Sequence, residues 1–383
     1  IDEVGDETHL TFFEMLGNFS FGEYFKEQAI KLAHNFFTSI NLPIQYVTVF
    51  EGDRDVPADT ESEGIWRRLG VMDIRKRSRS DNFWGPTGNE GPCGPTTEIY
   101  VQDTEIWNIV FNQYYCHSDK TLEPLKQSGV DTGMGLERLA MVLQGKSNIF
   151  ETDLFAPVVN LLPDAIEDIY KRVIADHSRA CTFLLTDGVR TSNKGAGYIL
   201  RRLIRRMTLY EMRLGFSFEL LARLVGEVIT HYHEAYPELK TEQGVILQEF
   251  NIEQEKFRKM LPSFRQRVQE LIREKEGLPQ YARRMRDNFG HRSEDYANLV
   301  SGYEAYKIYE TYGVPPELIN DELAQRGYGY HKGEFDKAFK EAREKHQEVS
   351  RAGQEKKFGW HGLILDTGEL KAASEEELKI VTR

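Results

Sequence analysis

The spacing of hydrophobic and polar positions changes partway along the chain. In the first 150 or so residues, short runs rich in aromatic and β-branched residues predict strands over residues 11–16, 44–50 and 104–115. Apolar residues three and four positions apart predict a helix over residues 23–39. Prolines and glycines dominate residues 85–95, which predicts a rigid, irregular loop with no helix or strand of its own.

From about residue 153 onward the apolar positions follow the helical period. They predict helices over residues 171–185, 196–210, 218–233 and 242–276, and after residue 351 the sequence becomes polar and glycine-bearing. We therefore expect an α+β protein: residues 1–152 form a mixed domain built on a sheet, residues 153–350 form a mostly helical domain, and residues 351–383 form a linker.

Composition narrows the class of protein. Hydrophobic residues make up 40% and charged residues 29% of the 383 positions, as is typical of a soluble globular chain, and no apolar run approaches the roughly 18 residues of a membrane span. The three cysteines show no CxxC spacing, which predicts reduced thiols in a cytoplasmic protein with no metal site. The net charge of -12 means that a nucleic-acid partner would have to meet a local basic patch.

The stretch VDTGMGLER, residues 130–138, combines small and charged residues. Gly133 and Gly135 would let the backbone lie against a ligand, and Gly135 also opens a predicted helix. Arg138 could bind a phosphate, while Glu137 could orient that arginine or hold Mg²⁺. The alternative is an ordinary strand-to-helix turn with a surface ion pair.

Two further stretches carry candidate chemistry. Near the proline- and glycine-rich segment, Trp84 could wall a small pocket and Glu98 could bind a metal or a substrate ammonium, although an isolated tryptophan is more often a core aromatic. In the predicted helix 196–210, four arginines fall within an arc of about 140°, opposite an apolar side. The members of this basic stripe are Arg201, Arg202, Arg205 and Arg206. The stripe predicts contact with a phosphate backbone, and the alternative is a solvated, ion-paired face.

Six segments in order along the chain resemble the alanyl-tRNA synthetase family of class II aminoacyl-tRNA synthetases. They are TFFEMLGNFSFGEYFK, DNFWGPTGNEGPCGPTTEIY, EIWNIVF, VDTGMGLERLAMVLQG, IADHSRACTFLLTDGVRTSNKGAGYILRRLIRR and SGYEAYKIYETYGVPPEL. The resemblance implies a class II antiparallel sheet with helices, followed by a helical tRNA-recognition domain. It also implies that ATP and Mg²⁺ are used to convert alanine to alanyl-adenylate, which is then transferred to the 3′ end of tRNA(Ala).

The resemblance also implies roles for individual residues. In the sheet-containing part, Arg138 would contact ATP phosphate, Gly133 and Gly135 would leave room for adenosine and the amino acid, and Asp131 would bind the α-ammonium of alanine. Trp84 would wall the methyl pocket and Asn108 would hold the substrate carboxylate. Residues Phe12, Phe13 and Glu14 would lie at the ATP site, with one of the two phenylalanines against adenine.

In the helical part, Asn193 and Asp321 would read a G·U pair in the acceptor stem, and the four arginines would contact that stem. As alternatives, Asn193 is a loop residue or helix cap and Asp321 is an ordinary polar helix residue.

The printed sequence also departs from the family. The first class II motif, the arginine of the second motif and the editing domain with its His and Cys zinc cluster are absent from it. We therefore expect weak catalysis or none from this chain, and poor exclusion of serine and glycine from the alanine pocket. The sequence does not predict an oligomeric state. Two other hypotheses stay open: a catalytically inactive tRNA- or ATP-binding fragment or paralogue, and a stand-alone ATP-dependent amide ligase.

Overall fold

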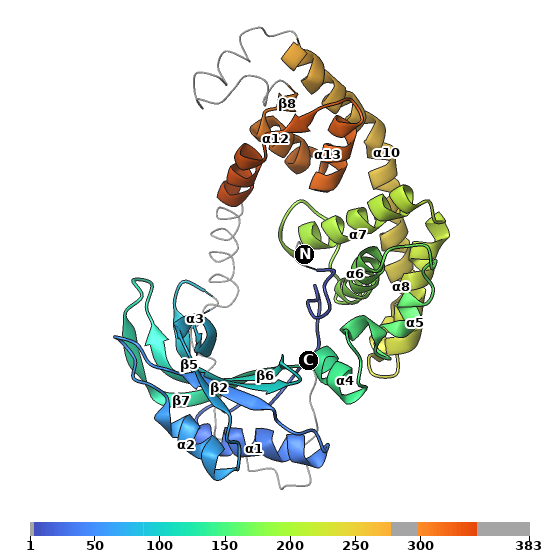
Figure 1. Ribbon diagram of the computed structural model, residues 1–383. Helices are drawn as coiled ribbons and strands as arrows, with labels where there is room; N and C mark the ends of the chain where they lie inside the picture. The colour runs from blue at the N-terminus through green and yellow to red at the C-terminus, as the bar shows by residue number, and fades with distance from the viewer. Residues whose placement is uncertain (1–3, 87, 277–297, 343–383) are drawn as a thin grey trace. The chain divides into compact units, whose positions relative to one another are not determined.

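The first part of the chain folds around a seven-stranded sheet. In the computed structural model, which describes residues 4–86, 88–276 and 298–342, the strand order is β1-β7-β6-β5-β2-β3, and β4 pairs with β5 (Figure 1). Among these described strands every pairing is antiparallel except that of β2 with β3, so the expected antiparallel sheet is confirmed. The strands are β1 (Met15–Leu16), β2 (Tyr46–Phe50), β3 (Ile74–Arg77), β4 (Phe83–Trp84), β5 (Gly91–Val101), β6 (Thr104–Cys116) and β7 (Leu122–Gly135).

One face of this sheet is apolar and packs against two helices, α1 (Lys26–Ser39) and α2 (Thr60–Arg68). Along β6 the alternate residues Trp107, Ile109 and Phe111 are buried on this face. Trp107 lies edge-on to Phe36 of α1, with 5.8 Å between ring centroids. Because side chains alternate across a strand, the residues between them point to the opposite face.

Two predictions for this part of the chain were wrong, one for the extent of a strand and one for the extent of a loop. Within residues 11–16 only Met15–Leu16 is a strand, because the backbone just before it bonds to helix side chains: the Thr11 amide donates to Asp176 Oδ1 at 2.8 Å. The loop predicted over residues 85–95 becomes strand from Gly91. A Cβ at Gly94 would lie 1.8 Å from the Phe111 carbonyl oxygen, so glycine is what allows β5 to pack against β6 here.

The expected helices are confirmed with shifts of a few residues at their ends. The helix predicted over residues 23–39 begins at Lys26, and the four later ones are α6 (Asp168–Thr186), α7 (Gly195–Leu214), α8 (Phe218–Tyr232) and α10 (Gln243–Glu276). The remaining elements are α3 (Arg79–Asn82), α4 (Leu136–Leu143), η1 (Ile149–Glu151), α5 (Ala156–Val159), α9 (Pro237–Thr241), β8 (Leu299–Val300), α12 (Gly302–Tyr312), α13 (Pro316–Ala324) and β9 (Gly329–Tyr330).

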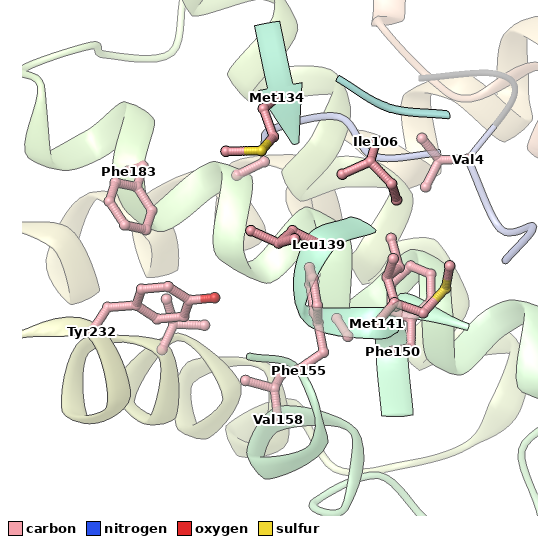
Figure 2. Packing of buried hydrophobic residues seen from close by; sticks show 14 of the residues in the cluster. Val4, Ile106, Met134, Leu139, Met141, Phe150, Phe155, Val158, Phe183 and Tyr232 are labelled. Atoms are coloured by element: carbon pink, nitrogen blue, oxygen red, sulfur yellow. The ribbon is translucent and has the colours of Figure 1, made fainter. Parts of the chain in front are cut away.

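The hydrophobic core joins the sheet to the first helices that follow it. Figure 2 shows this cluster, with Met134 of β7, Leu139 of α4, Phe183 of α6 and Tyr232 of α8. The chain divides into two units at residues 335/336, and the contacts described below all lie within the first. The boundary at residues 152/153 stays a prediction, and the predicted linker 351–383 lies outside the described residues.

Candidate active site

A row of polar positions crosses the open face of the sheet. Thr48, Glu98, Asn108 and Gly133 stand opposite one another in register on β2, β5, β6 and β7. Asp131 lies two residues from Gly133 and therefore on the same face. Neighbouring strands are about 4.8 Å apart, so Asn108 and Asp131 are diagonal neighbours. The structure thus brings together three residues expected to contact alanine, which are Asn108, Asp131 and Gly133.

Trp84 lies on β4, opposite Gly94 of β5. Asn82, two residues before Trp84, is buried and donates from Nδ2 to Thr48 Oγ1 at 2.8 Å. This hydrogen bond anchors the segment to the polar face of the sheet. Trp84 itself is half-buried, unlike the fully buried tryptophan of α2. This half-buried position is compatible with a pocket wall, and the role of Trp84 stays a prediction.

Glu98 is the buried carboxyl group of this face. Its side chain is 6% exposed and accepts hydrogen bonds from Thr48 Oγ1 at 3.0 Å and Tyr100 Oη at 2.9 Å. Burial, helped by the negative charge of Glu105, raises the pKa of Glu98 to about 7. The described residues contain no cluster of three His, Cys, Asp or Glu side chains that could hold a metal by themselves. A Mg²⁺ carried by ATP phosphates needs only one or two carboxylates, and Glu98 with Glu105 fits that requirement.

Arg138 lies in the first turn of α4, directly after β7. Its Nη1 donates to the Glu105 carbonyl oxygen at 3.1 Å and lies 3.6 Å from Glu105 Oε2. The half-buried guanidinium is therefore held at the end of β6 that carries Asn108, beside a helix N-terminus that favours anions. An arriving phosphate would compete with Glu105 for this guanidinium.

Glu137 does not have the predicted role. It is 1% exposed and forms an ion pair with Arg179 of α6, while Arg138 is held by Glu105. The side chain points into the core because Glu137 lies on the same side of α4 as the buried Met141, one turn later. The expectation that Glu137 orients Arg138 or holds Mg²⁺ was wrong, and so was the alternative of a surface Glu137–Arg138 pair.

Phe12, Phe13 and Glu14 separate into two groups. Phe13 is 51% exposed and is the ring available to a ligand. Phe12 stacks on Phe183 with 4.5 Å between centroids, and Glu14 Oε1 accepts from Tyr236 Oη at 2.5 Å. Phe12 and Glu14 thus contact residues of the helical part, and their expected contacts with ATP stay predictions.

Gly133 and Gly135 of β7 differ in the space above them: Gly133 has little room, whereas Gly135 has ordinary van der Waals space. A Cβ at Gly133 would lie 3.3 Å from Met15 Sδ, and one at Gly135 would lie 3.8 Å from the Arg138 side chain. The neighbour of Gly133 is an exposed, flexible methionine, so a ligand reaching Gly133 would displace a side chain rather than backbone.

Arg179 was missed in the sequence. It occurs within IADHSRACTFLL, directly after the polar residues Asp176, His177 and Ser178, and it is 1% exposed. The local pattern gives no clear signal of this burial, because full burial of arginine depends on partners from other segments.

The four arginines of the predicted basic stripe, all on α7, do not form one solvent-facing stripe. Arg205 is 7% exposed, with Nε donating to Glu253 Oε1 at 2.7 Å and Nη1 donating to the Tyr312 carbonyl. Arg201, Arg202 and Arg206 are half-buried. The expectation that Arg205 contacts RNA was therefore wrong, because Arg205 lies in the interior. The alternative of a solvated face is wrong for Arg205 as well.

Asn193 and Asp321 are held at different places along α7. Asn193 is exposed and accepts from Arg201, whereas Asp321 pairs with Arg213. The two arginines are 12 positions apart, which is about 18 Å along the helix. The structure thus gives each residue its own arginine and does not join them in one cluster.

Comparison with known families decides the class of this protein. The family described as tRNA synthetases class II (A) matches residues 1–378. The chain belongs to this family. Class II synthetases use ATP, which agrees with the polar face and Arg138 described above.

Several curated relatives are named "Alanine--tRNA ligase". The protein of Borrelia hermsii (strain HS1 / DAH) is 41% identical over 98% of this chain and 65% of its own length. That of Treponema pallidum (strain Nichols) is 39% identical over 94% of this chain and 62% of its own length. That of Dehalococcoides mccartyi (strain CBDB1) is 37% identical over 85% of this chain and 38% of its own length. The chain therefore spans less than two thirds of the curated relatives it matches.

Two other properties can be stated for the described part of the chain. None of its helices has the length and apolar content needed to cross a bilayer. Cys93, Cys116 and Cys181 are buried free thiols.

Proposed function

We propose that this protein is an alanine-tRNA ligase that activates alanine with ATP and transfers it to the 3′ end of tRNA(Ala). The observation that carries the proposal is the placement of Asp131 and Asn108 on the open sheet face, at the end where Arg138 is held. A carboxylate for an ammonium, an amide for a carboxylate and an arginine for a phosphate are the groups that an amino acid and ATP require. The family membership and the names of the relatives support the same reaction.

The first step joins alanine to AMP. A carboxylate oxygen of alanine attacks the α-phosphorus of ATP, and the bond from that phosphorus to the bridging oxygen of pyrophosphate breaks. Asp131 would fix the ammonium, Asn108 would donate from Nδ2 to the carboxylate, and Arg138 would stabilise charge on the phosphates. The step depends on positioning and charge, so no nucleophilic side chain is needed.

The second step transfers the alanyl group. A hydroxyl of the terminal ribose attacks the carbonyl carbon of the adenylate, an ester forms, and AMP leaves with the bond electrons. Phe13 would hold adenine during both steps by stacking. Magnesium, when bound with ATP, neutralises phosphate charge, and Glu98 and Glu105 are the residues that would hold it.

The helical part is proposed to bind the acceptor stem. Asn193 is exposed before α7 and can both donate to and accept from a G·U pair in the RNA minor groove. Arg201, Arg202 and Arg206 stay candidates for the RNA backbone. Asp321 is held by Arg213 rather than by Arg201, so we propose that it contacts the stem away from the G·U pair instead of reading that pair with Asn193. Arg205 is left out because it is buried.

The test is pyrophosphate exchange into ATP with each of the twenty amino acids, using the full-length protein. Alanine should give the strongest exchange, and glycine should be weaker by about 10- to 200-fold because one methyl group separates the two substrates. Serine should give a signal between them. Asp131→Asn should abolish the alanine dependence while ATP binding, followed by calorimetry, is retained.

Other outcomes would favour the other hypotheses. Silence with all twenty amino acids, together with intact binding of ATP or tRNA, would indicate an inactive binding protein of the same family. Exchange with alanine but no preference for tRNA carrying the G·U pair, unchanged by Asn193→Ala, would favour an amide ligase.

A further inference from the structure

Arg179 is a buried arginine whose side chain leaves its own helix to contact the segments beside the proposed ATP site. From α6, its Nη2 donates to the Phe12 carbonyl oxygen at 2.7 Å and to Glu137 Oε1. Its Nη1 donates to Tyr232 Oη at 3.0 Å. The guanidinium carbon also lies 4.5 Å from the ring centroid of Phe155. Because the Arg179 guanidinium is planar and has several N–H donors, it can hold the carbonyl, carboxylate and hydroxyl groups at fixed positions at the same time.

These partners are neighbours of the proposed ATP contacts. Phe12 precedes Phe13, the exposed ring, and Glu137 precedes Arg138, the phosphate-binding candidate. The same Glu137 Oε1 also accepts from the Glu14 amide at 3.0 Å. One guanidinium and one carboxylate therefore fix the backbone on both sides of Phe13 and immediately before Arg138.

A second connection closes this arrangement. The Leu136 amide donates to the Glu14 carbonyl oxygen at 3.0 Å, so the start of α4 is tied directly to the segment of Phe13. Tyr236 Oη bonds to Glu14 Oε1 from the region after α8. The distance between Phe13 and Arg138 is thus set by the Arg179 and Glu137 side chains together with the backbone hydrogen bond from Leu136 to Glu14.

The alanine contacts are held in a different way. Asp131 and Asn108 lie within the β6–β7 ladder, where backbone hydrogen bonds fix their positions. Arg179 touches neither of them through the contacts above. A change at Arg179 should therefore act on the nucleotide and leave recognition of alanine nearly unchanged.

We propose that Arg179 is a positioning residue for ATP, which sets the separation of Phe13 and Arg138 without touching the substrate. The inference rests on the proposed function for the identity of the nucleotide site. It also assigns to α6, a helix of the predicted tRNA-recognition part, a role in the activation step.

The test compares Arg179→Lys with wild type in the full-length protein. Lysine keeps the charge beside Glu137 but cannot hold Phe12, Glu137 and Tyr232 together. The KM for ATP in alanine-dependent exchange should rise, or kcat should fall, by about 10- to 100-fold in all, while the KM for alanine stays within about twofold. The Kd for ATP, measured by calorimetry without alanine, should rise in parallel.

Arg172→Lys is the matched control. Arg172 is on the same helix and also reaches the N-terminal segment, where its Nη1 lies 3.1 Å from Glu7 Oε1, but it has no contact with Phe12 or Glu137. This variant should leave the ATP parameters within about twofold of wild type, since lysine keeps the charge beside Glu7 and the lost contacts lie away from Phe13 and Arg138.

Glu137→Gln provides a second variant if the lysine variant does not fold. It retains an oxygen acceptor for Arg179 and for the Glu14 amide but loses the charge, so ATP binding should weaken by less than in Arg179→Lys. Equal increases in the KM for ATP and for alanine, or no change in either, would overturn the positioning role. Wild-type protein that binds ATP but gives no exchange would refute only the proposed function, and the ATP Kd values of the variants would still decide the inference.

Discussion

The open sheet face and helix α7 both carry polar residues in a regular pattern, but the sheet residues stay on one face, whereas one arginine of the α7 pattern lies in the interior. On β6 and β7 the polar residues Asn108 and Asp131 lie on the face opposite the buried Trp107 and Ile109. On α7 the arginines are within one arc, but Arg205 is taken into the interior by Glu253 of α10. Alternation along a strand is a backbone property, whereas a helical stripe becomes surface only if no distant segment covers it.

The largest effect should come from Arg205→Ala, which tests the interior role on α7. Removing the arginine leaves Glu253 buried without its partner at 2.7 Å, so the free energy of unfolding should fall by about 3–5 kcal/mol. Urea unfolding measures this loss. Arg202→Ala, on the same helix, removes a guanidinium lying over the rings of Tyr198 and Tyr309 and should cost about 1 kcal/mol. Equal losses in the two variants would contradict the distinction drawn here.

Arg138→Ala tests the sheet side of the comparison. Loss of a charge-stabilising group should reduce alanine-dependent exchange by about 10²- to 10³-fold, with little change in the urea midpoint. Arg67→Ala is the control, because Arg67 is exposed on α2 and pairs with Glu63 at 2.9 Å on the other side of the sheet. Exchange that survives Arg138→Ala at the wild-type rate would remove Arg138 from the ATP site.

The buried carboxyl group of Glu98 predicts a pH dependence of stability. Its pKa is raised from 4.5 to about 7, so the folded protein holds the proton more tightly than the unfolded chain. The contribution is fully present below pH 4.5 and is lost as the pH rises through about 7, by up to about 3 kcal/mol. Urea unfolding of wild type and Glu98→Gln between pH 4.5 and 8 measures it. The difference between the two curves should change over this interval, and parallel curves would show that Glu98 does not titrate there.

The smallest effect is expected for Asn193→Ala. If Asn193 reads the G·U pair, the variant should lose about 1–3 kcal/mol of preference for stems with G·U over stems with G·C, measured by competition binding. Asp321→Asn is the comparison, because Asp321 is held by Arg213 rather than Arg201. Loss of the same preference in both variants would show that the two residues meet on one base pair and would contradict the separate contacts proposed here.

Much of the fold follows from local patterns that the sequence contains in full. Helices α6, α7, α8 and α10 and strand β6 were predicted within a few residues, because periods of 3.6 and 2 are properties of neighbouring positions. The strand that carries Asp131, β7, was not predicted, and its register with β6 comes from the structure. The sequence therefore determined these helices and β6, and the pairing of the strands placed Asn108 and Asp131 on one face.

Contacts between distant segments decided the rest. Residues 11–14 leave the strand conformation because Asp176 and Arg179, more than 160 positions later, bond to their backbone. Glu137 and Arg205 are charged residues that the sequence placed at a surface, and each is buried because an opposite charge from another helix meets it. Burial of a charge depends on a partner in space, and no local period specifies that partner.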